Sequence, residues 1–125
     1  MEQLKRLARN ASSRAYSPYS GIRVGAAVCD ESGRTFTGCN IENASYGLTL
    51  CAERVAMATA VAAGATEIKA LAVVLNADGE TVEKFTPCGA CLQFLAEFAD
   101  RDTPVSVGDV DFVLSDLLAN PFAVS

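Results

Sequence analysis

Two short motifs contain the residues that most constrain the fold of this 125-residue chain. The first is Cys-Ala-Glu at residues 51–53, and the second is Pro-Cys-Gly-Ala-Cys at residues 87–91. Cys88 and Cys91 are three residues apart at an expected helix start, so their sulfurs should lie on one face of that helix. Cys51 is expected at the start of a different helix. A site that uses all three thiols therefore requires both helix N-termini to point at it.

The thiols and one carboxylate predict an open metal site. Structural zinc sites are closed by four protein ligands, whereas catalytic sites keep one position for water, and Cys51, Cys88 and Cys91 have no obvious fourth partner. The chain has no histidine, which excludes Ser-His-Asp and Cys-His catalysis. Thiolates favour zinc or iron–sulfur clusters over harder ions. Glu53 lies two residues from Cys51 and is not needed as a ligand, so it is free to move protons.

Charge is the difficulty of such a site. Three thiolates around a +2 ion leave a net charge of −1, which is poorly suited to lowering the pKa of a bound water. The partial positive charge of two helix N-termini lowers thiol pKa values and stabilises thiolates. Arg54, next to Glu53, is the nearest cation in either motif, and we expect it to give electrostatic support.

Composition limits the partners. The net charge is −5 and the basic residues are scattered, whereas proteins that bind nucleic acid polymers usually carry a basic patch. A nucleobase substrate should therefore arrive as a free nucleoside. No apolar run approaches the roughly 18 residues that span a bilayer, and the N-terminus does not resemble a secretory signal. These features predict no membrane partner and a cytoplasmic location, and the length predicts a single domain over residues 1–125.

Hydrophobic spacing predicts an α/β layered domain. The helix over 50–63 has only three polar residues within 51–63, which predicts burial on all sides, by its own sheet and by neighbouring subunits. Thr49 is its candidate N-cap, and Thr86 is the candidate cap of a helix whose first residue is Pro87. The expected elements are helices over 2–15, 50–63 and 87–99, strands over 24–29, 35–40, 68–75, 104–107 and 110–114, a polar connection or edge over 81–86, and a last helical turn capped by Ser115.

Two other interpretations of the cysteines stay open. Cys88 and Cys91 could form a dithiol redox motif that needs no metal. A non-catalytic zinc module could recruit Cys29 or Cys39 as a fourth ligand. Both of these cysteines fall in predicted strands, where we expect them to be small core residues.

The metal motif is the signature of zinc-dependent base deaminases. Further stretches at residues 16–20, 24–27 and 38–47 make the chain resemble cytidine deaminase, of the small homotetrameric zinc-dependent type. The resemblance implies a three-layer α/β/α sandwich with a central mixed sheet of about five strands. It also implies one Zn²⁺ per chain, held by Cys51, Cys88 and Cys91, and a homotetramer with active sites shared between subunits.

The same resemblance implies substrate-binding roles. Asn40 and Glu42 would bind the ribose hydroxyls, although both could instead order a loop. The Ala52 backbone would face the exocyclic edge of the base. Phe122 would stack on the nucleobase in an adjacent subunit, or else be plain interface packing. Two further residues, Ile22 and Val24, would line the pocket.

The chain departs from the family pattern twice: Ile22 stands where Phe is usual, and Leu92 stands where Arg is frequent. The implied activity is hydrolytic deamination of cytidine and 2′-deoxycytidine to uridine and 2′-deoxyuridine with release of ammonia, by a zinc-bound hydroxide and a Glu53 proton shuttle, in pyrimidine salvage. A zinc-dependent deaminase of a modified nucleoside or nucleoside-like antibiotic is the alternative.

Overall fold

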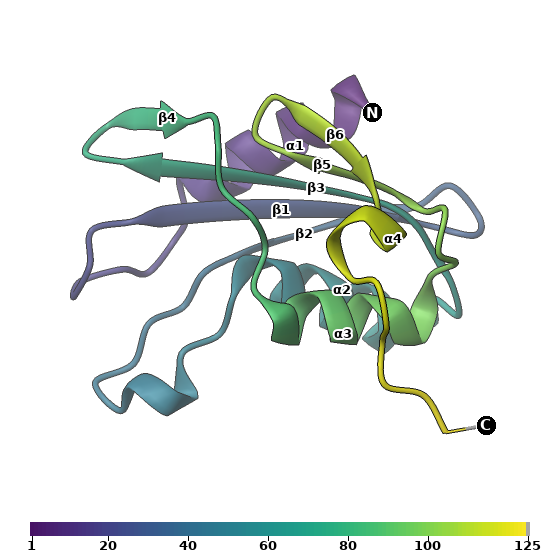
Figure 1. Ribbon diagram of the computed structural model, residues 1–125. Helices are drawn as coiled ribbons and strands as arrows, with labels where there is room; N and C mark the ends of the chain where they lie inside the picture. The colour runs from purple at the N-terminus through teal and green to yellow at the C-terminus, as the bar shows by residue number, and fades with distance from the viewer. Residues whose placement is uncertain (125) are drawn as a thin grey trace.

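The structure is a computed structural model that describes residues 1–124. It contains a mixed sheet with helices on both faces (Figure 1). In chain order the elements are α1 (Glu2–Ser12), β1 (Arg23–Asp30), β2 (Thr35–Cys39), the 3₁₀ turn η1 (Tyr46–Leu48), α2 (Ala52–Ala62), β3 (Ile68–Ala77), β4 (Glu80–Val82), α3 (Gly89–Phe98), β5 (Pro104–Val107), β6 (Val110–Val113) and α4 (Leu114–Leu117).

The sheet follows the strand order β2-β1-β3-β5-β6. β3 and β5 are parallel and the other neighbouring pairs are antiparallel, so the sheet is mixed as predicted. The short strand β4 pairs with the end of β3 outside this path, in the segment that the sequence indicated as a connection or an edge. The five-strand prediction is therefore confirmed for the main path.

Three layers are present. α1 covers one face of the sheet, and α2 and α3 lie side by side on the opposite face (Figure 1). Each face has its own apolar cluster: Leu4, Ala8, Ala27 and Val74 belong to the α1 side, and a larger cluster that includes Met57 belongs to the α2/α3 side. The predicted three-layer sandwich is confirmed.

Small residues let the helices approach the sheet closely. A Cβ added at Gly25 of β1 would lie 1.9 Å from the Ala8 carbonyl oxygen of α1. A Cβ added at Gly38 of β2 would lie 2.4 Å from the backbone nitrogen of Ala56 and 2.7 Å from the carbonyl oxygen of Ala52. Such separations are far inside van der Waals contact, so only glycine fits at either position. Gly38 thereby fixes the first turn of α2 against the sheet.

The helix starts differ from the predicted ones. The N-cap of α2 is Cys51 and that of α3 is Cys88, so the predictions of Thr49 and Thr86 as N-caps and of Pro87 as a first helical residue were wrong. Both cysteines have extended backbone and neither makes a side-chain capping bond. Propensity rules favour Ser, Thr, Asp or Asn at an N-cap, and they missed two positions where the side chain has another use.

Two other boundaries were also wrong. α1 ends at Ser12 and not at residue 15. The hydroxyls of Ser12 and Ser13 each donate to a carbonyl three residues earlier, and such local bonds compete with continued helix. The cap of α4 is Val113 and not Ser115. Here the Asp116 carboxylate accepts a hydrogen bond from the Val113 backbone N–H at 2.9 Å.

Helix α2 is not buried on all sides within one chain. Ala52, Glu53 and Met57 are buried against the core. On the other side Ala58, Thr59 and Ala62 are exposed. The burial predicted for the whole helix stays a prediction that needs a neighbouring subunit. No helix within residues 1–124 is long and apolar enough to cross a membrane.

Candidate metal centre

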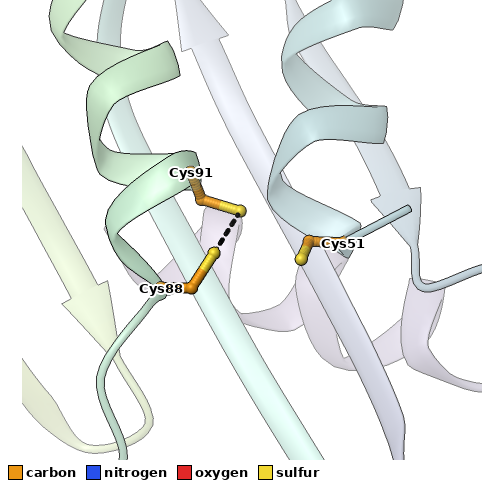
Figure 2. Close-up of side chains that lie close together, drawn as sticks. All are labelled: Cys51, Cys88 and Cys91. Carbon is orange, nitrogen blue, oxygen red and sulfur yellow. Dashed lines mark hydrogen bonds between the residues drawn. The ribbon is translucent and has the colours of Figure 1, made fainter. Parts of the chain in front are cut away.

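Three sulfur atoms meet where α2 and α3 begin. Cys51 and Cys88 occupy the two N-cap positions, and Cys91 lies in the first turn of α3. Their Sγ atoms all lie within 4.8 Å of one another, and the Cys88 and Cys91 sulfurs are 3.4 Å apart (Figure 2). The N-terminal ends of both helices therefore face one cluster, as the motifs required.

The other two cysteines are not part of this cluster. Cys29 and Cys39 are half-buried in β1 and β2, and the metal-binding group found within residues 1–124 contains only Cys51, Cys88 and Cys91. A closed zinc module with Cys29 or Cys39 as fourth ligand thus has no support in the geometry. A dithiol that uses only Cys88 and Cys91 does not explain why Cys51 converges on them from another helix.

The donor set fits zinc. Zn–S bonds of about 2.3 Å in a tetrahedral site place sulfurs roughly 3.8 Å apart, a value between the 3.4 Å of the Cys88–Cys91 pair and the 4.8 Å limit of the cluster. Thiolates are soft ligands that suit this ion. Three protein ligands leave a coordination position for water or substrate.

The surrounding groups favour a thiolate at Cys51. A hydrogen bond from the Cys91 thiol, together with the Arg54 guanidinium, lowers the pKa of Cys51 to about 5. The same contact and burial raise the pKa of Cys91. Among the protein groups alone, Cys51 therefore carries the negative charge and Cys91 keeps its proton, which metal binding would release.

Arg54 is the cation at the cluster. Its Nη2 donates to the Cys51 sulfur at 3.6 Å, and this contact raises the pKa of the guanidinium. Its Nε is buried and has no hydrogen-bond partner within residues 1–124. Leu92 does not take part, because its side chain is buried in the core between α3 and the sheet. The charge compensation near the thiols thus depends on Arg54 and the two helix N-termini.

Glu53 lies beside the sulfurs in the first turn of α2. It is only 5% exposed, and burial is the main cause that raises the pKa of its carboxyl group. The negative charge of Cys51 acts in the same direction, while a hydrogen bond with Cys91 opposes it. A raised pKa makes the carboxylate a stronger base than an ordinary Glu, and the protonated group can then return the proton as an acid.

Asn40 binds the backbone at the start of β1. Its Oδ1 accepts from the Val24 N–H at 2.8 Å, and its Nδ2 donates to the Ile22 carbonyl oxygen at 2.9 Å. Asn40 is 8% exposed, while Ile22 is 38% exposed. The amide keeps one donor hydrogen and one acceptor lone pair for a further partner.

Glu42 binds the loop between α1 and β1. One carboxylate oxygen accepts from the backbone N–H groups of Tyr19 and Ser20 at 3.0 and 3.1 Å, and the other accepts from the Ser20 hydroxyl. The Ser20 hydroxyl in particular lowers the pKa of Glu42. Glu42 lines an open cavity of about 440 Å³ together with Tyr19, Tyr46 and Thr49. The loop-ordering contact and access to a ligand therefore coexist.

The remaining predicted residues lie at very different depths. Ala52 is fully buried in the first turn of α2, next to the metal ligand Cys51. Phe122, in contrast, is 78% exposed on the C-terminal tail.

The sequence did not predict the hydrogen-bond partners of Glu42 and Phe122. Ser20 binds Glu42, and Gln93 binds the Phe122 backbone. Neither contact has a sequence signal, because each joins segments that are distant along the chain.

A layered α/β protein with three convergent thiols and a buried carboxyl group at two helix starts has the site of a zinc-dependent base deaminase. The family model described as "Cytidine and deoxycytidylate deaminase zinc-binding region" matches residues 1–107. The cytidine deaminase of Sporosarcina psychrophila is 44% identical over 115 residues, which is 89% of this chain and 82% of the relative. The chain therefore belongs to the cytidine and deoxycytidylate deaminase family.

Solved structures agree with this assignment. The crystal structure of cytidine deaminase from Mycobacterium tuberculosis matches with a TM-score of 0.87 and 38% identity, and covers 98% of this chain and 97% of that one. Cytidine deaminase from Burkholderia pseudomallei matches with a TM-score of 0.86 and 40% identity, over 97% and 98% of the two chains. Because both matches extend over nearly the whole chain, the described tail and the metal centre belong to one similar fold.

Proposed function

We propose that this protein catalyses the hydrolytic deamination of cytidine and 2′-deoxycytidine to uridine and 2′-deoxyuridine, with release of ammonia. The observation that carries the proposal is the meeting of three thiols and the buried carboxyl group of Glu53 at the starts of α2 and α3. Family membership supports it, because the relatives that match over most of the chain are named cytidine deaminase.

Cys51, Cys88 and Cys91 would hold one Zn²⁺ per chain. When bound, zinc supplies a Lewis acid that makes water a nucleophile near neutral pH. Arg54 and the two helix N-termini offset the negative charge of three thiolates, and this offset favours that chemistry over a strongly anionic centre.

Glu53 moves the protons. Its carboxylate takes a proton from the attacking water and delivers it to N3 of the cytosine ring, which makes C4 open to attack. It then takes the proton of the hydroxyl group now on C4 and delivers it to the amino group, so that the C4–N bond breaks, ammonia leaves and the C4 carbonyl of uridine forms. One carboxyl group serves first as base and then as acid, and the raised pKa of Glu53 suits both steps.

The remaining roles concern the nucleoside. Asn40 and Glu42 would bind the sugar hydroxyls with the hydrogen-bonding capacity that their loop contacts leave free, and the Ala52 backbone would face the base. Ile22 and Val24, which Asn40 holds through their backbones, would line the pocket. Phe122 would stack on the nucleobase of an adjacent subunit in a homotetramer. A place in cytoplasmic pyrimidine salvage completes the proposal.

The first experiment measures bound zinc per chain and the absorbance loss as cytidine becomes uridine, on one purified sample. We expect one zinc per chain and turnover that stops when a chelator removes the metal. Zinc without turnover on cytidine or deoxycytidine would contradict the proposal. In that case a panel of modified cytidines tests the alternative substrate class that the exposed Ile22 suggests.

A further inference from the structure

The C-terminal tail leaves the core after α4 and is held by side chains of the α3 region. The Arg101 guanidinium donates to the Ala119 carbonyl oxygen at 2.7 Å. Phe122 lies three residues after Ala119, and the Gln93 side chain binds both of its backbone groups. The Gln93 Nε2 donates to the Phe122 carbonyl oxygen and the Gln93 Oε1 accepts from the Phe122 N–H, each at 2.9 Å. Gln93 lies two residues after the metal ligand Cys91 on α3.

This pair of hydrogen bonds fixes the orientation of the Phe122 backbone. In an antiparallel pair of strands, a hydrogen-bonded residue exchanges both its N–H and its C=O with one partner, and its side chain stands out of the hydrogen-bonding plane. The Gln93 amide takes the place of that partner residue. The backbone of Phe122 is held in this way, and its ring is left 78% exposed.

Apolar packing does not explain the arrangement. A cleft of about 380 Å³ lies between the tail and the α3 surface, lined by Ala96, Glu97 and Pro121 among others. Phe122 and Val124 are both largely exposed. An aromatic ring left in water contributes little to the stability of its own chain, so two well-formed polar contacts that hold it there serve a purpose other than core formation.

We infer that Gln93 is a positioning residue for the proposed reaction: it presents the Phe122 ring for nucleoside binding by fixing the Phe122 backbone. This inference rests on the proposed contact between Phe122 and the nucleobase. It adds that the presentation comes from the same helix that carries Cys88 and Cys91. Helix α3 thereby holds two metal ligands of its own site and also positions the ring that would stack in the site of an adjacent subunit.

The test compares Gln93→Leu, Gln93→Glu and the control Glu97→Gln. Leu removes both hydrogen bonds at similar size, while Glu still accepts from the Phe122 N–H and cannot donate to its carbonyl. Glu97 lies one turn further along α3 beside the same cleft, and among residues 1–124 its carboxylate makes no hydrogen bond or ion pair to the tail. The measurements are KM and kcat for cytidine, zinc per chain, and hydrogen exchange of the C-terminal peptide.

For Gln93→Leu we expect faster exchange in the C-terminal peptide, unchanged zinc, and a KM raised about five- to thirtyfold, within the range for losing an aromatic partner of a stacked base. Gln93→Glu should give a smaller change and Glu97→Gln none. In a Phe122→Ala background, Gln93→Leu should add nothing to KM, because the ring that it positions is gone.

Two outcomes overturn the inference separately from the proposed function. Unchanged hydrogen exchange in Gln93→Leu would mean that Gln93 does not hold the tail, whatever the kinetics. KM effects of Gln93→Leu and Phe122→Ala that simply add would mean that Gln93 acts independently of the ring. If Phe122→Ala itself leaves KM unchanged while exchange rises in Gln93→Leu, the contact exists but the proposed role of Phe122 fails, and the positioning role fails with it.

Discussion

The two ends of the candidate site are built differently. The metal end is complete in one chain: Cys51, Cys88 and Cys91 converge, and Glu53 lies buried beside them. At the nucleoside end, Glu42 accepts hydrogen bonds from the loop between α1 and β1, and Phe122 projects into solvent. In the function proposed above, the chemistry uses groups of one chain, whereas nucleoside binding also uses an aromatic ring from a second chain.

The difference follows from what each end of the site must do. Three converging thiols and a buried carboxyl group need fixed positions, which two helix starts packed on a sheet provide. A nucleoside must enter and leave, and the residues proposed to bind it lie on loops and a tail. Substitutions at the metal end should act on kcat, and those at the nucleoside end should act on KM.

The largest effect is expected at Glu53. Glu53→Gln keeps the shape of the side chain but cannot accept and release protons, so kcat should fall by about 10²- to 10⁴-fold. Zinc per chain should not change, because Glu53 is not a ligand. The measurement is cytidine turnover together with metal analysis of the same sample. Turnover within tenfold of the original would contradict the proton-shuttle role.

A large effect on KM is expected at Glu42, and Ser20 offers a matched control. Ser20→Ala breaks only the hydroxyl contact and keeps the two backbone bonds to Glu42, so it measures what a partial loss of loop order does to KM. If Glu42 binds the sugar, Glu42→Ala should raise KM for cytidine by about tenfold or more beyond Ser20→Ala, as for a hydrogen bond to a charged group.

The substrate itself provides the complementary test of Glu42. With 2′,3′-dideoxycytidine, which lacks the sugar hydroxyls, the extra effect of Glu42→Ala should disappear. An equal loss with cytidine and with the dideoxy compound would show that Glu42 acts through the loop alone.

Mixing of variant subunits tests directly whether one site uses residues from two chains. Chains with Phe122→Ala and chains with Glu53→Gln should each have low activity alone. If Phe122 serves a neighbouring subunit, mixed oligomers regain part of the activity, because some sites combine an intact Glu53 with an intact Phe122. Native mass spectrometry verifies that the oligomers are mixed. Mixed oligomers without recovered activity would contradict a shared site.

The smallest kinetic effect is expected far from both ends, at the buried Asp30 in the β1–β2 turn. Burial acts to raise the pKa of Asp30, but hydrogen bonds from Ser32 and Arg34 outweigh it and the pKa is lowered. The folded state is then favoured above the unfolded pKa of about 3.9, and this stabilisation is lost as the pH falls through the folded pKa.

Asp30→Asn should therefore lower the midpoint of urea unfolding at pH 7 and make it less dependent on pH between about 5 and 2, with unchanged KM at neutral pH. Glu31→Gln in the same turn is a useful comparison, because its carboxylate accepts from the backbone N–H groups of Thr66 and Glu67 on the surface. An Asp30→Asn variant with the original acid sensitivity would contradict the role given to this carboxylate.

Much of the architecture was predictable because it depends on local pattern. Apolar runs identified β1 and β3, and the spacing of Cys88 and Cys91 at a helix start placed both sulfurs on one side. The family resemblance supplied the three layers and the mixed sheet. The exact helix starts were missed, because capping propensity does not register that Cys51 and Cys88 face a shared metal centre.

The sequence by itself determined the chemistry: three thiols, no histidine and a free carboxylate leave few options for a reaction centre. The tertiary structure decided which groups meet. It set the buried environment that raises the pKa of Glu53, excluded Leu92 from the thiols, and joined Gln93 to the Phe122 backbone. These contacts link segments far apart along the chain, and desolvation and long-range pairing exist only once those segments have packed together.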